Sequence, residues 1–171
     1  ESLDCAIALQ ELESLGVNRI ITFDVHDANV SNAIPRLPFE NIYPTNVIIS
    51  EIVNKEKILN EELVIISPDF GAMERAKYYA EVLKSNVGVF YKRRDLTKVV
   101  NGKNPIIEHK YIGDDVKGKN VLIVDDMIAS GDSVIEVARD LKKIGAENVY
   151  VTATFALFTS GIDKIRKAYE E

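Results

Sequence analysis

Two adjacent acids, Asp125 and Asp126, directly follow four apolar residues, VLIV, at positions 121–124. Such a run is typical of a strand that is covered on both faces, as in a parallel sheet. After two spacer residues comes ASGDS at 129–133, which opens the next predicted helix. Carboxylates accept hydrogen bonds from sugar hydroxyls, and the free N–H groups of a helix N-terminus suit a phosphate. This order of residues indicates a sugar-phosphate site at the carboxyl end of the strand.

The same segment also fits a structure without a ligand. In that interpretation Asp125 and Asp126 are solvated acids in a loop, and Ser130 or Ser133 is only a helix N-cap. The local pattern alone leaves both interpretations open.

A histidine and an acid follow two other predicted strands. The strand at 19–23 runs into the sequence DVHD, and the strand at 63–66 is followed by a turn that contains Asp69. His26, between acids, is either a metal ligand that its neighbours orient or an ordinary surface histidine. Both residues lie at the edge of the sheet where ligands bind in α/β folds.

The strongest local basic run, Lys92, Arg93 and Arg94, ends the predicted strand at 87–91. A charge run is usually a solvated surface. Here it comes directly after a strand, where the other candidate residues also lie, so it is also placed to neutralise phosphate charge.

Strands alternate with helices along the chain, which predicts an α/β fold with a doubly wound parallel sheet. Three prolines in residues 31–46 predict a connection between two lobes, and the apolar residues there predict that it packs onto a core. A helix is predicted at 47–60 and an edge strand at 106–112. His109, in that edge strand, has no evident chemical partner and is interpreted as structural.

Composition narrows the class of protein. The chain has 171 residues, with 27 acids against 21 Lys and Arg, and this net charge of -6 argues against a nucleic-acid-binding domain. The single cysteine allows no internal disulfide and favours a reducing compartment. No apolar run approaches the length of a membrane span, and no signal peptide is evident, so we expect a cytoplasmic protein without a membrane partner.

The segment VLIVDDMIASGDS resembles the phosphoribosyl-pyrophosphate (PRPP) loop of the type I phosphoribosyltransferase fold. Together with TFDVHDANVSNAIPRLPFENIYPTN, SPDFGAMERA and FYKRRDL, it resembles the ribose-phosphate pyrophosphokinase family over essentially the whole chain. The resemblance implies transfer of the diphosphoryl group of ATP to ribose 5-phosphate, which yields PRPP and AMP, by a homo-oligomer. It also implies that residues 1–46 are the end of a truncated N-terminal lobe with the interlobe connection. Residues 47–171 are then the C-terminal phosphoribosyltransferase-like lobe.

The resemblance assigns roles residue by residue. It implies Mg²⁺ as the cofactor, bound by His26 and Asp69, and Lys92 and Arg94 as the catalytic residues that stabilise the transferring group. The substrate-binding residues are the ribose-hydroxyl acceptors and the 5-phosphate loop: Asp125, Asp126, Ser130, Gly131, Asp132 and Ser133. The loop departs from the family pattern at Ala129, where an acid is frequent, and at Asp132, where a glycine is usual.

Two alternatives remain open at this point. A base phosphoribosyltransferase that consumes PRPP needs only the loop and leaves His26 without a role. A non-catalytic regulatory relative that binds sugar phosphates is favoured by Ala129 and Asp132.

Overall fold

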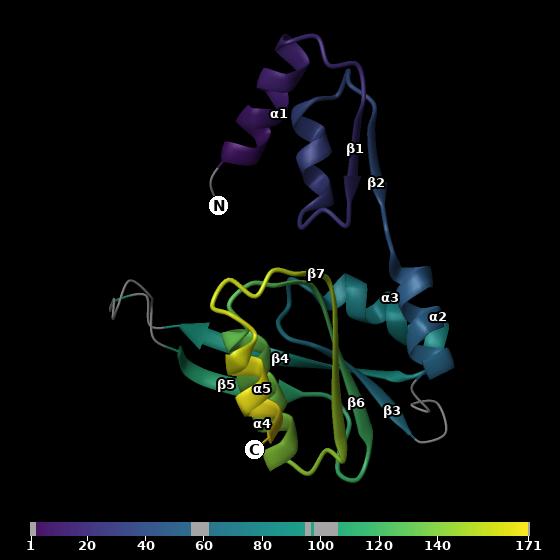
Figure 1. The fold of residues 1–171 in the computed structure, drawn as a ribbon, viewed down its shortest axis with the longest axis vertical. Helices are drawn as coiled ribbons and strands as arrows, with labels where there is room; N and C mark the ends of the chain where they lie inside the picture. The colour runs from purple at the N-terminus through teal and green to yellow at the C-terminus, as the bar shows by residue number, and fades with distance from the viewer. Residues whose placement is uncertain (1–2, 56–61, 95–96, 98–105, 171) are drawn as a thin grey trace. The chain divides into compact units, whose positions relative to one another are not determined.

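A computed structural model describes residues 3–55, 62–94, 97 and 106–170 of the chain. The chain divides into two compact units, Glu1–Val47 and Ile48–Glu171, and each is described by itself (Figure 1). The boundary falls in the first turn of helix α2, Thr45–Lys55. The rest of the helix predicted to reach residue 60 lies outside the described residues.

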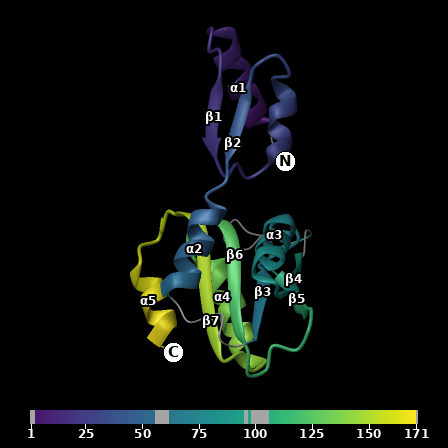
Figure 2. The ribbon, with the colours of Figure 1, turned by 90° about the vertical axis from the view of Figure 1, so that its right-hand side faces the viewer.

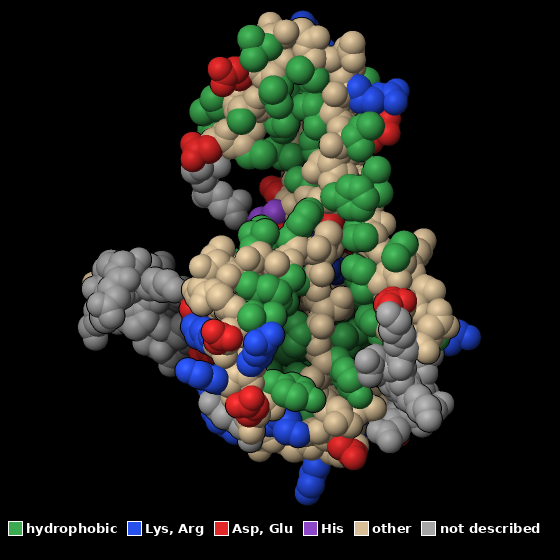
Figure 3. Space-filling view, viewed as in Figure 1, with side chains coloured by type: hydrophobic (Ala, Val, Ile, Leu, Met, Phe, Trp, Pro, Cys, Tyr) green, Lys and Arg blue, Asp and Glu red, His purple; other side chains and the backbone are tan. Residues whose placement is uncertain are grey.

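The first unit places two helical segments beside a parallel strand pair. In order, its elements are α1 (Asp4–Ser14), β1 (Ile20–Phe23), the 3₁₀ helix η1 (Ala28–Ala33) and β2 (Phe39–Ile42). Leu9 from α1 packs with Ile34 and Leu37 to form a small core. The face of the strand pair that carries Ile21 and Phe23 remains exposed, and Figure 3 shows that hydrophobic side chains are exposed on both units.

The prediction that residues 31–46 are only a connection was wrong in part. The strand β2 lies inside this segment and pairs in parallel with β1. Pro38 and Pro44 flank the strand instead of interrupting it, so every residue of β2 keeps its N–H group. The prediction that the segment packs onto a core is confirmed, because Ile34 is 1% exposed.

The second unit contains a five-stranded sheet in the order β5-β4-β3-β6-β7. Its strands are β3 (Leu63–Ser67), β4 (Asn86–Arg94), β5 (Ile106–Ile112), β6 (Asn120–Ile128) and β7 (Asn148–Ala156). All neighbours are parallel except β4 and β5, which form an antiparallel pair. The doubly wound α/β fold and the edge strand at 106–112 are therefore confirmed, with one antiparallel edge in a mainly parallel sheet.

Helices cover both faces of this sheet (Figures 1 and 2). Helix α4 (Asp132–Lys143) packs on one face, and α2 and α3 (Met73–Leu83) pack on the other. Successive side chains of β6 point to opposite faces of the sheet and pack in two different hydrophobic cores. Val121 and Ile123 face α4, whereas Leu122 and Val124 face α2 and α3. Both faces of the strand need apolar side chains, which explains the uninterrupted run VLIV. A short helix α5 (Asp163–Glu170) follows β7.

The strand order reverses at β3, because β4 lies on one side of it and β6 on the other. The pairing of β3 with β6 ends at Ile66 and Ile123, whereas β6 continues beside β7 as far as Ile128. The predicted strand end at residue 124 was therefore four residues too early. The two acids still lie beyond the carboxyl end of β3, at the switch point where open α/β sheets bind ligands.

Candidate active site

The carboxyl groups of Asp125 and Asp126 lie together on β6, past the end of β3. Asp126 is 5% exposed, and its backbone N–H donates to Asp125 Oδ1 at 2.9 Å. Burial raises the pKa of Asp125 to about 7, and a side-chain hydrogen bond with Asp126 and the charges of Asp126 and Asp69 add to this rise. Near neutral pH the pair therefore holds a shared proton for part of the time.

Asp69 lies in the turn after β3 and is close enough to Asp125 to raise its pKa. Its Oδ1 accepts hydrogen bonds from the N–H groups of Gly71 at 2.9 Å and Ala72 at 3.2 Å. The buried Ser67 hydroxyl donates to the Asp69 carbonyl oxygen at 2.6 Å. These bonds fix the turn that leads into α3 and hold the carboxylate at the edge of the sheet.

The predicted phosphate loop leads directly into α4. Gly131 precedes the helix with φ +83°, a left-handed conformation that suits glycine. A Cβ atom there would lie 3.2 Å from the side chain of Ile165 in α5. The Asp132 carboxylate accepts a hydrogen bond from the Ser130 hydroxyl at 2.9 Å and pairs with Lys164 of α5. The negative charge of Asp132, which departs from the family pattern, is therefore balanced by Lys164 within the same unit.

The structure brings Lys92 of β4 to the same loop. Its Nζ donates to Ser133 Oγ at 2.9 Å and lies 3.7 Å from Glu136 Oε2, and the Lys92 side chain is only 9% exposed. Arg94 is the last residue of β4, so the strand runs three residues past its predicted end at residue 91 and contains the basic run. The Arg94 side chain lies outside the described part of the structure.

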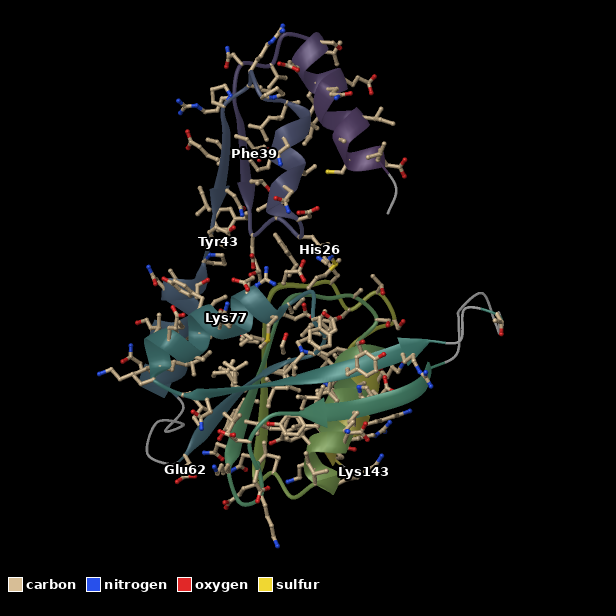
Figure 4. The ribbon with its side chains drawn as sticks, turned by 180° about the vertical axis from the view of Figure 1, so that it is seen from behind. His26, Phe39, Tyr43, Glu62, Lys77 and Lys143 are labelled. Atoms are coloured by element: carbon tan, nitrogen blue, oxygen red, sulfur yellow. The ribbon has the colours of Figure 1, made fainter. Side chains whose placement is uncertain are left out.

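His26 belongs to the first unit. It follows β1 by three residues and is exposed. Figure 4 labels its position in the first unit. The preceding buried acid, Asp24, has φ +43°, and Asp27 accepts a hydrogen bond from the N–H group of Asn29 at the start of η1. The chain is therefore sharply turned on both sides of His26.

Sequence reasoning missed the groups that contact the candidate residues from α4 and β5. His109, interpreted as structural, lies opposite Lys92 in the β4–β5 pair, with its Nδ1 2.7 Å from Asp140 Oδ2. Ser133, Glu136 and Asp140 recur at intervals of three and four residues along α4, so they share one face. That spacing is the signal in the sequence from which this polar face could have been found.

The acids at this edge fit a cation that is only partly enclosed by protein. Within the ranges that the structure describes, no group of three or more His, Cys, Asp or Glu side chains is arranged to hold a metal ion. Mg²⁺ is usually held by one or two carboxylates, with waters and substrate phosphates as its other ligands. Asp69, beside the acid pair, is a suitable ligand of this kind. None of the helices in the described parts of the chain has the length and apolar character of a membrane span.

Comparison with known proteins identifies the family to which the sequence is related. The pattern of the family described as "Phosphoribosyl transferase domain" matches residues 42–170. The chain is 36% identical over 165 residues to a ribose-phosphate pyrophosphokinase from Pyrococcus abyssi, covering 96% of this chain and 54% of the relative. It is 32% identical over 158 residues to one from Chromobacterium violaceum, covering 92% of this chain and 45% of the relative. The chain thus spans about half the length of the curated relatives it matches.

The fold is also similar to that of a solved structure. The phosphoribosylpyrophosphate synthetase structure from Mycobacterium smegmatis superposes with a TM-score of 0.78 at 23% identity, covering 92% of this chain and 47% of that one. At this identity the likeness shows the fold. The match over residues 42–170 shows that the chain belongs to the phosphoribosyl transferase domain family.

Proposed function

We propose that this chain is part of an enzyme that makes PRPP, by transferring the diphosphoryl group of ATP to ribose 5-phosphate with Mg²⁺ as cofactor and AMP as the other product. The observation that carries the proposal is the contact between Lys92 and Ser133, because it joins the basic strand end to the sugar-phosphate loop. A phosphoribosyltransferase that only consumes PRPP needs the loop and leaves His26 without a role. The names of the relatives support the same activity.

In this proposal the acid pair and the loop hold the two ends of ribose 5-phosphate. Asp125 and Asp126 accept hydrogen bonds from the ribose hydroxyls, and Ser130, Gly131 and Ser133 bind the 5-phosphate at the start of α4. Asp132 shapes this loop, since its carboxylate is already engaged by Ser130 and Lys164. The anomeric hydroxyl is left free to attack.

The transfer itself needs cations and positioning more than covalent chemistry. The oxygen of the anomeric hydroxyl forms a bond to the β-phosphorus of ATP and releases its proton to solvent. The bond from that phosphorus to the α-phosphate oxygen breaks, and AMP leaves. Lys92 and Arg94 offset the negative charge that develops on the phosphoryl oxygens. Asp69 of the second unit is a suitable ligand for Mg²⁺, and the resemblance assigns the same role to His26 of the first unit. Mg²⁺ would supply additional charge neutralisation when bound. The homo-oligomer implied by the resemblance stays a prediction.

The test is AMP release from Mg-ATP, with and without ribose 5-phosphate, in the longest natural chain that contains this sequence. We expect AMP only when ribose 5-phosphate is present, since an ordinary kinase leaves ADP. Lys92→Ala should lower turnover by about 100-fold or more, as does the loss of other groups that stabilise transition-state charge. A folded protein that binds ribose 5-phosphate but releases no AMP would instead support the non-catalytic relative.

A further inference from the structure

The ammonium group of Lys92 lies in an unfavourable place for a cation. It contacts Ser133, the second residue of α4, and the N-terminus of a helix carries partial positive charge. With only 9% of the side chain exposed, water screens this charge poorly. Something other than the helix must therefore hold Lys92 there.

Glu136 supplies the opposite charge from the next turn of α4. Its Oε2 lies 3.7 Å from Lys92 Nζ, and its Oε1 lies 3.9 Å from His109 Nδ1. One carboxylate thus faces the two neighbouring residues of the β4–β5 pair, since Lys92 and His109 lie opposite each other in that pair. Glu136 connects the end of β4 to α4, the helix into which the phosphate loop leads.

A second acid on the same face fixes the histidine. Asp140 Oδ2 lies 2.7 Å from His109 Nδ1, and Lys143 Nζ donates to Asp140 Oδ1 at 2.8 Å. The His109 ring is 10% exposed and lies against Phe90, with ring centroids 4.7 Å apart. His109 is therefore held on one side by an acid and on the other by the core, so the ring that Glu136 faces beside Lys92 is fixed in place.

We propose that Glu136 is a positioning residue for the catalytic Lys92, and that His109 and Asp140 brace it. The inference rests on the proposed function and deepens it: the same helix that binds the 5-phosphate also sets the place of the lysine that acts on the transferring group. In this proposal the effect of Glu136 on the reaction passes through Lys92, whose Nζ lies 3.7 Å from its carboxylate. Misplacement of a charged group by about 1 Å lowers rates by about 100-fold in well-ordered sites.

The test is a double-mutant cycle in the longest natural chain, with AMP release as the readout. We expect Glu136→Gln to lower kcat about 10- to 100-fold and to leave the KM for ribose 5-phosphate within about twofold. In a Lys92→Met background the same change should have no further effect on kcat, because the residue through which it acts is gone. Glu74→Gln is the control, since Glu74 also pairs with a lysine, Lys77, but on the exposed surface of α3.

Two results would overturn the inference while the proposed function stands. One is an unchanged kcat in Glu136→Gln, and the other is a further loss of kcat in the double variant, which would indicate a merely structural role. If Glu136→Gln fails to fold, Asp140→Asn takes its place with the same two criteria and a smaller expected loss. Failure of the proposed function looks different, because the wild-type chain itself would then release no AMP.

Discussion

At Asp125, binding and stability make opposite demands. A buried carboxylate beside two other acids is well placed to accept hydrogen bonds from a sugar, but its charged form is disfavoured there. The pKa rises from 3.8 to about 7, so the folded protein takes up a proton that the unfolded chain releases in this range. Its free energy of unfolding therefore falls as the pH rises from about 4 to about 7.

Replacing Asp125 should remove this pH dependence. We expect Asp125→Asn to have a higher melting temperature than the wild type, with a small advantage at pH 5 and a larger one at pH 8, because the amide has no charge to bury. Its affinity for ribose 5-phosphate should fall about 10-fold or more, since the site loses one of two charged acceptors. Thermal melts from pH 5 to 8 and titration calorimetry test both expectations. Asp163→Asn, on the exposed start of α5, is the control, and an advantage that is equal at every pH would contradict the explanation.

The sequence predicted the types of residue at the site better than their contacts. Lys92 and Ser133 were both candidates, but the bond between them joins positions 41 residues apart. It depends on the length of β4 and on the pairing with β5, neither of which is encoded by a local pattern. For the same reason His109 had no visible partner until α4 was placed beside it.

At the scale of elements, the start of α4 depends on its contact with α5. Gly131 and Gly161 both have left-handed backbones, with φ +83° and +78°. A Cβ atom at Gly131 would press on Ile165, whereas at Gly161 nothing lies within 4 Å. The two positions share the same backbone strain and differ in packing.

This difference gives a paired prediction. Gly161→Ala should destabilise the chain by about 1 kcal/mol, from the backbone alone. Gly131→Ala should lose about 1 kcal/mol more, because Ile165 has to move. Urea unfolding measures both values, and equal losses would mean that α5 yields to the added methyl group without cost.

Element boundaries were the weakest part of the sequence prediction. The run VLIV correctly located β6, but the polar residues after it hid the continuation as far as Ile128, which pairs with β7. Prolines hid β2 in the same way, although they only flank it. In both cases the strand is defined by a partner that is distant in sequence.

At the scale of the whole molecule, the alternation of strands and helices in the sequence was sufficient to predict the α/β fold class. The runs LVII and VLIV need cover on both faces, and the two helical layers provide it. The antiparallel edge formed by β5 was not predicted as such, because alternation alone does not give strand direction. The division into two compact units also separates the candidate residues: the sugar-phosphate loop lies in the second unit and His26 in the first.

Because these residues belong to different units, we predict that a change at His26 affects the Mg²⁺ requirement but not the binding of ribose 5-phosphate. If the second unit binds the sugar phosphate by itself and His26 serves Mg²⁺ and ATP, then His26→Ala should leave the ribose 5-phosphate Kd within about twofold of the wild type. AMP release in the longest natural chain should fall about 10-fold or more, and should need more Mg²⁺ for half-maximal rate. Calorimetry and rates at a series of Mg²⁺ concentrations measure the two effects on one protein preparation. A large loss of ribose 5-phosphate affinity would assign His26 to the sugar site instead, and an unchanged Mg²⁺ requirement would make it an ordinary surface histidine.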